Sequence, residues 1–232
     1  MSNSAQKSYD YAAADFNAVY RGGELLDGAG ITSVPWDIGE AQPGVVEFDR
    51  LGRFRGEVLD VGCGLGDNAI FLAGRGHRVT AVDAASSAIE QATARARGAD
   101  IQFAVADATS LAGYEGRFDT VLDSALFHTL DAEGRRRYAA ALHRASKPGA
   151  WLDMLCFAEV PGGMPAPLSV SEADVRAVLD GAGWKITDFG QTVYWGVAAA
   201  TKPFMEKVGL RVKIDAQGRT HLPVWSVQAD RV

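Results

Sequence analysis

Residues 58–66 read VLDVGCGLG, a short apolar run followed by three glycines at a spacing of two. The run predicts a buried strand, and the residues from Asp67 onward predict a helix. Glycines in such a turn permit positive φ angles and let a ligand approach the backbone closely. The start of the helix adds free N–H groups and the positive end of a dipole. The stretch therefore predicts a ligand site, with candidate residues Asp60, Gly62, Cys63, Gly64 and Gly66.

The glycine spacing distinguishes between two classes of nucleotide ligand. A dinucleotide fingerprint, G-x-G-x-x-G, would place its last glycine at position 67, where this chain has Asp67. A carboxylate there is a poor neighbour for a pyrophosphate but is tolerable beside a cationic sulfonium and an amine. The spacing weakens a nicotinamide-dependent oxidoreductase and favours S-adenosylmethionine (SAM). A purely structural glycine turn is the remaining alternative.

Strand-like and helix-like segments alternate on either side of this turn. Near-continuous apolar strands between helices predict a mostly parallel α/β sheet covered on both faces. A helix from position 86 would be capped by Ser86, and positions 196–209 fit either a helix or an irregular lid. The expected strands are 57–61, 78–82, 101–106, 118–123, 150–157, 184–194 and 223–229, and the expected helices are 67–75, 86–97, 132–146 and 171–180.

The first 55 residues carry no strand signal. They predict a helix over Tyr9–Tyr20 and another over Pro43–Phe54, joined by the loop ITSVPWDIGEAQP. We expect a single domain over 1–232, with a helical cap over 1–55 and a ligand-binding core over 56–232.

Composition limits the classes of partner and the cellular location that we expect. The chain is 47% hydrophobic and 22% charged, with a net charge of −6, which argues against nucleic acid as a partner. We find no apolar run of transmembrane length and no signal-peptide core at the start. Cys63 and Cys156 are expected on strands too far apart for a disulfide. We expect a cytoplasmic protein, a monomer or homodimer, without a metal ion.

Acidic residues end three of the predicted strands: Asp83, Asp107 and Asp123. Ligands of open α/β sheets bind beyond the carboxyl ends of the strands. Asp83, followed by Ala84, can accept both ribose hydroxyls of a nucleoside. Asp107 can accept from the adenine amine, with the backbone N–H of Ala108 beside it. For any single acid, helix capping is an equally good explanation.

At these residues the sequence resembles the class I SAM-dependent methyltransferases. The resemblance covers about 57–229 and rests on VLDVGCGLG, AVDAASSAIEQA, VADAT, FDTVLDSALFH and AVLDGAGWKI. It implies a Rossmann-like seven-stranded sheet of order 3-2-1-4-5-7-6, with strand 7 antiparallel and helices on both faces. The last predicted strand, 223–229, would be strand 7.

A narrower resemblance links PWDIGEAQP, LDSALFHTL and RRRYAAALHRASKPGA to the thiopurine and halide/thiol methyltransferases. These motifs are also similar to those of actinobacterial enzymes that methylate hydroxyquinolones or quinones. The resemblance implies that Trp36 lies over the cofactor; packing of the N-terminal helix is the alternative. Thiopurine enzymes often carry Arg after the fourth-strand acid, whereas this chain has Ser124, a departure from that pattern.

The expected activity is methyl transfer to an O, N or S atom of a small aromatic or heterocyclic molecule. His128, beyond the fourth strand, is the candidate general base, because an unperturbed imidazole titrates near neutrality; a structural contact to a loop carbonyl is the alternative. Tyr20, Tyr194 and Trp195 are the candidate substrate-binding residues. The other aromatic and Met candidates for the pocket, which could equally be core, are Phe16, Met164, Phe204 and Met205. A SAM-binding sensor without turnover is the alternative function.

Overall fold

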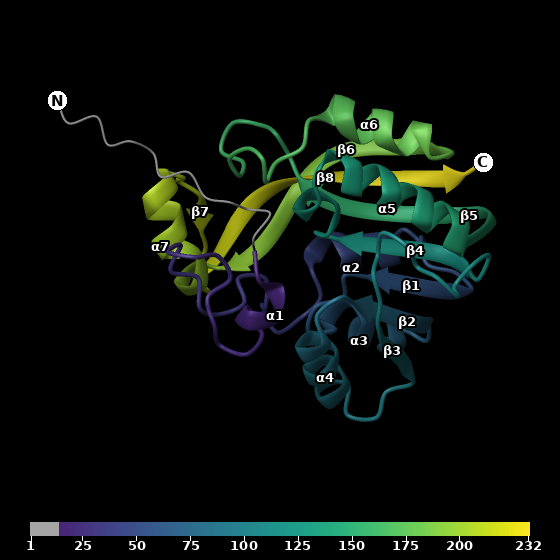
Figure 1. Cartoon of the computed structure of the whole chain (residues 1–232), viewed down its shortest axis with the longest axis horizontal. Helices are drawn as coiled ribbons and strands as arrows, with labels where there is room; N and C mark the ends of the chain where they lie inside the picture. The colour runs from purple at the N-terminus through teal and green to yellow at the C-terminus, as the bar shows by residue number, and fades with distance from the viewer. Residues whose placement is uncertain (1–13) are drawn as a thin grey trace.

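A computed structural model describes residues 14–232. They form one sheet in the order β3-β2-β1-β4-β5-β8-β6, with β7 paired to the free end of β8 (Figure 1). The strands are β1 (Glu57–Val61), β2 (Arg78–Asp83), β3 (Ile101–Val105), β4 (Phe118–Ser124), β5 (Ser146–Phe157), β6 (Trp184–Val197), β7 (Lys213–Ile214) and β8 (Arg219–Arg231).

The strand order confirms the predicted topology. Strands β1 to β5 pair in parallel, and β8 runs antiparallel to both β5 and β6. The strand in the seventh position is β8 because the two-residue β7 precedes it in the chain. It begins at Arg219 instead of Pro223, since it pairs with β6 back to Val197.

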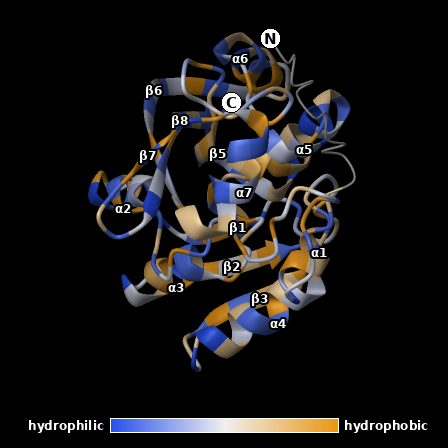
Figure 2. Ribbon diagram, turned by 90° about the vertical axis from the view of Figure 1, so that its left-hand side faces the viewer, coloured by the Kyte–Doolittle hydropathy of each residue, from blue (hydrophilic) through white to orange (hydrophobic). Residues whose placement is uncertain are grey.

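Helices cover both faces of the sheet, as expected. Adjacent residues of β1 enter different apolar clusters, one on each face of the sheet: Val58 packs with α2 and α3, and Leu59 packs with α5 and α6. In Figure 2 the central strands β1 and β2 are mainly hydrophobic, while α4 alternates between the two colours. The helices are α1 (Phe16–Val19), α2 (Pro43–Arg50), α3 (Asp67–Gly74), α4 (Ser86–Arg95), the 3₁₀ helix η2 (Phe127–Thr129), α5 (Ala132–Ala145), α6 (Glu172–Gly181) and α7 (Ala198–Val208).

The structure corrects the predicted cap of α4. Ala85, not Ser86, is the N-cap, and it makes no side-chain capping bond. Instead, the Asn17 side chain accepts hydrogen bonds from the Ser87 backbone N–H (3.1 Å) and hydroxyl (2.5 Å). The first turn of α4 is therefore held by α1, a segment 70 residues away.

Helix boundaries also differ from the predictions near glycines. The helix predicted to reach Phe54 ends at Arg50, and Gly52 follows with a φ of +70°. Most of the undecided stretch is helical as α7, which ends at Val208, and Gly209 follows with a φ of +69°. The predicted helix Tyr9–Tyr20 is seen as Phe16–Val19, and residues 9–13 lie outside the described part. None of the helices in residues 14–232 is long and apolar enough to cross a membrane.

Candidate active site

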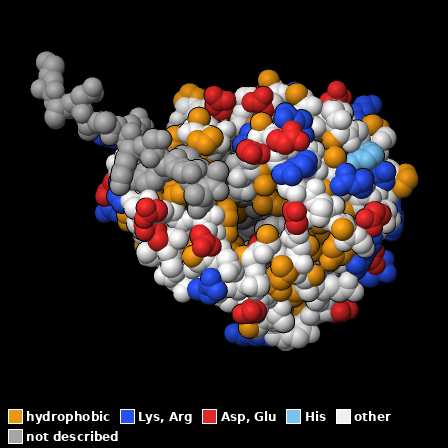
Figure 3. All heavy atoms as spheres, in the orientation of Figure 1, with side chains coloured by type: hydrophobic (Ala, Val, Ile, Leu, Met, Phe, Trp, Pro, Cys, Tyr) orange, Lys and Arg blue, Asp and Glu red, His pale blue; other side chains and the backbone are white. Residues whose placement is uncertain are grey.

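A cavity of about 390 Å³ lies at the carboxyl ends of β1, β2 and β4. Its walls come from the glycine turn, the strand ends, the N-terminal segment, η2 and α7. Figure 3 shows a hollow on this face of the molecule, bordered by hydrophobic side chains. Asp83 belongs to the polar end of the cavity at the glycine turn, and Phe157 and Phe204 belong to its apolar end beside η2 and α7.

The glycine turn has the conformation that its sequence predicts. Gly62, Gly64 and Gly66 have φ angles of +70°, +54° and +83°. A Cβ on Gly64 would lie 3.0 Å from the Tyr20 hydroxyl and 3.3 Å from Trp36 Nε1. Tyr20 and Trp36 therefore lie directly over the turn, and a Cβ at position 64 would require both side chains to shift.

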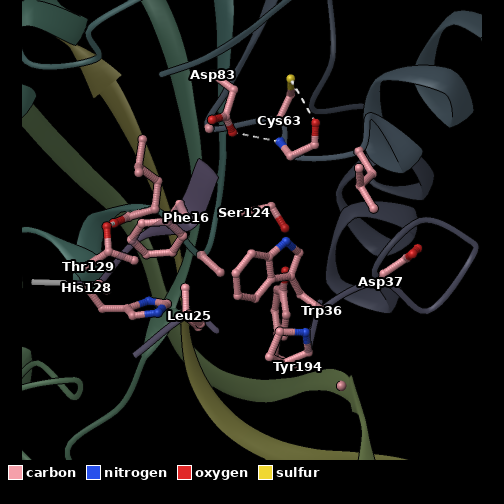
Figure 4. Close-up of a pocket in the computed structure, with 18 of the residues that line it drawn as sticks. Phe16, Leu25, Trp36, Asp37, Cys63, Asp83, Ser124, His128, Thr129 and Tyr194 are labelled. Atoms are coloured by element: carbon pink, nitrogen blue, oxygen red, sulfur yellow. Dashed lines mark hydrogen bonds between the residues drawn. The ribbon is translucent and has the colours of Figure 1, made fainter. Parts of the chain in front are cut away.

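Asp83 ties the turn to the end of β2. Its carboxylate accepts hydrogen bonds from the backbone N–H of Gly64 and of Ala85, each at 2.9 Å. Burial raises the pKa of Asp83, although these amide bonds oppose the shift. Asp83 also lines the cavity together with Ala84, and Figure 4 shows it beside Cys63. Both oxygens keep lone pairs that a ligand hydroxyl can use.

Asp60 is buried behind the turn and is poorly compensated. It is 1% exposed, and its carboxylate has no well-formed hydrogen bond among residues 14–232, only a weak interaction with the backbone amide of Ala69. Burial, together with the nearby charges of Asp123 and Asp83, raises its pKa to about 7. Buried carboxyl oxygens normally have partners, so Asp60 fits a polar or cationic ligand at the turn.

Aromatic residues of the N-terminal segment close the cavity above the turn. Trp36 donates from Nε1 to the Tyr20 hydroxyl at 3.2 Å, and its ring lies 5.9 Å from that of Phe16. Gln42 anchors this segment to β6: its side chain accepts from the Trp195 N–H and donates to the Trp195 carbonyl, both at 2.9 Å. Sequence reasoning missed Gln42, although it belongs to the PWDIGEAQP motif.

An ion-pair network fixes the loop after Trp36. Arg95 on α4 bonds to Asp37 at 2.7 Å and lies 3.4 Å from Asp67 at the start of α3. Burial raises the pKa of Asp67, and Arg95 opposes that shift. Both carboxylates border the cavity.

His128 lies at the apolar end of the cavity, on η2. Its ring stacks on Phe157 with 4.0 Å between centroids, and Tyr194 meets Phe157 edge-on at 6.1 Å. Burial, and secondarily the charge of Arg135, lowers the pKa of His128 to about 3. This shift removes the near-neutral titration on which the general-base prediction depended. Phe157, the last residue of β5, was not predicted at the site.

Four predicted site residues have side chains that do not line the cavity, and Asp60 behind the turn is the first of them. Asp123 is fully buried, and its oxygens accept from the backbone of Leu126 and Phe127 and from the Tyr138 hydroxyl. It therefore caps the turn into η2, the alternative that the sequence left open. Asp107 is exposed and accepts from the Thr109 N–H and hydroxyl, both at 2.8 Å.

Trp195 is the fourth predicted site residue whose side chain does not line the cavity. Successive strand residues point to opposite faces, so Tyr194 lines the cavity while the Trp195 ring packs 4.6 Å from the Arg219 guanidinium and 6.0 Å from His221. Ser124 and Ala108 do line the cavity, as do Phe16, Met164 and Phe204, whereas Met205 does not.

The fold and this turn define a class of nucleotide-binding enzymes, and comparison with known proteins identifies the family. A methyltransferase-domain family model matches residues 58–149. The chain is 34% identical over 202 residues to a 2-heptyl-1-hydroxyquinolin-4(1H)-one methyltransferase of Mycobacteroides abscessus, covering 85% of this chain and 88% of that protein.

Solved structures with similar folds include one from work on a biosynthesis and one of a methyltransferase. One, from work on conversion of a disulfide bond into a thioacetal group during echinomycin biosynthesis, is 34% identical with a TM-score of 0.78 and covers 93% of this chain and 91% of its own. The Burkholderia thailandensis 1,6-didemethyltoxoflavin-N1-methyltransferase, with bound S-adenosylhomocysteine, shares the fold at 22% identity and a TM-score of 0.59, over 82% of this chain and 77% of its own. The chain belongs to the SAM-dependent methyltransferases.

Proposed function

We propose that this enzyme transfers a methyl group from SAM to an O, N or S atom of a small aromatic or heterocyclic acceptor. The observation that carries the proposal is one continuous cavity with a polar end at the glycine turn and an apolar aromatic end. Its volume of about 390 Å³ falls within the usual range for small-molecule sites, roughly 300–1,000 Å³. The hydroxyquinolone and toxoflavin acceptors of the two relatives support a flat heterocycle.

The polar end fits SAM. The ribose hydroxyls would bond to Asp83, with the neighbouring Ala84 beside them, and the adenine would lie towards Ala108 and, at the rim, Asp107. The amino-acid part would lie along the turn, against Gly62, Cys63 and Gly64, with Gly66 shaping the bend and Trp36 above it. Asp60 behind the turn and Ser124 on β4 complete the polar surroundings. When bound, SAM supplies an electrophilic methyl group on a cationic sulfur.

The protein's own contribution is alignment and exclusion of water. A tightly closed site fixes the approach of the acceptor to the methyl group, and such positioning accounts for a large part of the rate enhancement in transfer reactions. Tyr20 and Tyr194 both line the cavity. The segment up to residue 55 would act as the cap over the core of 56–232, with Phe16 and Trp36 as its contacts to the cavity.

The sequence supports the remaining aspects of this proposal. A net charge of −6 disfavours a nucleic-acid acceptor.

Incubation with SAM and a panel of heteroaromatic hydroxyls, thiols and amines tests the activity. We expect S-adenosylhomocysteine and one methylated product by mass spectrometry, and calorimetric binding of SAM but not of NADH. Tight SAM binding without product from any member of the panel would contradict the proposed acceptor class.

A further inference from the structure

The backbone of β5 determines which nitrogen of His128 can carry a proton. The Phe157 backbone N–H donates to His128 Nδ1 at 3.3 Å. Only an unprotonated ring nitrogen can accept such a bond, so a neutral His128 carries its hydrogen on Nε2. Protonation of both nitrogens would place two N–H groups against each other.

The charged and titratable neighbours also keep the ring neutral. Arg135 on α5 donates to the carbonyls of Phe127 and His128, at 3.3 and 3.2 Å, and holds its positive charge next to η2. Cys156 on β5 and Tyr194 on β6 have pKa values that burial raises, so neither supplies a negative charge. No carboxylate in residues 14–232 bonds to the His128 ring.

The Nε2–H edge is the one available to a ligand. His128 is only 5% exposed and lines the cavity, and Nε2 has no hydrogen-bond partner among residues 14–232. Figure 4 shows the His128 ring as part of the cavity wall, to which Phe16 and Leu25 also belong. A single N–H donor therefore projects among otherwise apolar groups.

The other titratable groups of the cavity are poorly placed to take a proton from an acceptor. Asp37 and Asp67 are paired with Arg95, and Glu40 is paired with Arg219 at 2.6 Å. Asp83 is bonded to backbone amides at the opposite end. Burial raises the pKa values of Cys63 and Tyr20, as it does for Tyr194, so all three stay protonated.

We propose that His128 is a positioning hydrogen-bond donor, which binds the acceptor as an oxyanion through Nε2–H and selects acidic heteroaromatic hydroxyls or N-hydroxyls. This inference rests on the proposed function and narrows its substrate class. The transfer balances without a proton: the oxygen–carbon bond forms, the carbon–sulfur bond breaks, and its electron pair stays on sulfur. The transfer neutralises opposite charges, which is favourable where the bound acceptor and SAM have displaced water.

Two substitutions separate a donor from a base. His128→Gln keeps a side-chain oxygen for the Phe157 N–H and an amide N–H for the cavity, but it cannot act as a base. His128→Leu removes both functions. The probe is 2-heptyl-1-hydroxyquinolin-4(1H)-one, whose absorption spectrum reports its ionisation. Its affinity is measured by quenching of tryptophan fluorescence, without SAM.

We expect the wild-type enzyme and His128→Gln to bind the probe in its anionic form with similar affinity. His128→Leu should bind it about tenfold or more weakly, because a donor to a charged group is lost. The kcat/KM of the wild type should follow the ionisation of the probe alone. Retained SAM affinity and circular dichroism show whether each variant is folded, and ¹⁵N NMR of the wild-type imidazoles gives an independent reading if His128→Leu does not fold. That spectrum should show a neutral Nε2–H His128 between pH 5 and 8.

Three outcomes would overturn the inference. The first is a His128 ring that titrates near neutrality, and the second is a His128→Gln variant as defective as His128→Leu in turnover and binding. The third is methylation of thiols or amines with no binding of the hydroxyl probe, which would leave the proposed function intact. Failure of every acceptor in the wider panel would instead contradict the proposed function itself.

Discussion

At the scale of single residues, the carboxylates at the strand ends have three different roles. Asp83 faces the cavity and holds the glycine turn through two amide bonds. Asp123 is buried and caps the start of η2. Asp107 is exposed and closes its own turn. The same residue type at equivalent strand ends thus has different environments, because the following loop decides which donors reach each carboxylate.

Asp83→Asn is expected to weaken SAM binding by at least about tenfold, since hydrogen bonds to a charged group contribute about 1.5–3 kcal/mol. Isothermal titration calorimetry measures the change. Asp188→Asn, the same substitution at an exposed position of β6, is the control and should bind SAM as the wild type does. Equal affinities in the two variants would contradict the ribose assignment.

At the scale of elements, the junction between β1 and α3 depends on glycine for two separate reasons. Positive φ angles favour glycine at Gly62, Gly64 and Gly66. At Gly64 the contacts to Tyr20 and Trp36 add a steric requirement. Glycine is therefore favoured by the backbone conformation of the turn and, at position 64, also by the aromatic side chains above it.

Gly64→Ala should lower stability and also reduce SAM affinity, because the new methyl group displaces the Tyr20 and Trp36 side chains. Gly76→Ala is the matched control: Gly76 has a φ of +92° and nothing within 4 Å of a Cβ. It should lose about 1 kcal/mol of stability from backbone strain alone. Denaturant unfolding and calorimetry distinguish the two, and unchanged SAM affinity in Gly64→Ala would count against the close fit.

A second prediction at this scale concerns the start of α4. Asn17→Ala removes the acceptor for the Ser87 N–H and hydroxyl and should cost about 1 kcal/mol, the typical value of a capping side chain. Ser86→Ala, at the exposed position that the sequence predicts as the cap, should be nearly neutral. Urea unfolding of both variants measures the difference, and a larger loss in Ser86→Ala would restore the local cap.

At the scale of the whole molecule, the cavity brings together segments that are far apart in the chain. Trp36, Asp83, His128 and Tyr194 come from four different elements or loops and meet only when the sheet is complete. The same assembly buries Asp60 on β1 and Asp123 on β4, both with pKa values raised to about 7. These carboxyls make the stability of the folded chain depend on pH.

The Asp60 contribution has a definite sign. Its pKa rises from an ordinary value of about 4 to about 7 on folding, so its stabilising effect is complete below pH ~4 and is lost as the pH rises to ~7. Relative to Asp60→Asn, the wild type without SAM should lose up to about 1.4 kcal/mol per pH unit in this window. Urea unfolding at a series of pH values measures it, and parallel curves for the two proteins would contradict the prediction.

The sequence by itself determined the succession of strands and helices along the chain and the glycine turn. These features depend on hydrophobic periodicity and backbone preferences within a few residues, which a linear pattern records. The resemblance of longer motifs indicated the family and placed Trp36 at the cavity. The sequence predicts the directions of the other side chains less well, because two adjacent residues such as Tyr194 and Trp195 have similar propensities but point to opposite faces of the sheet.

Only the tertiary structure decided the environment of each site group. The cap of α4 comes from Asn17, 70 residues away, and the partner of His128 Nδ1 is the Phe157 amide, 29 residues away. Burial lowers the pKa of His128 to about 3, which removes the near-neutral titration that the sequence predicted. Hydrogen-bond partners and desolvation depend on which distant segments pack together, and no local pattern in the chain encodes that.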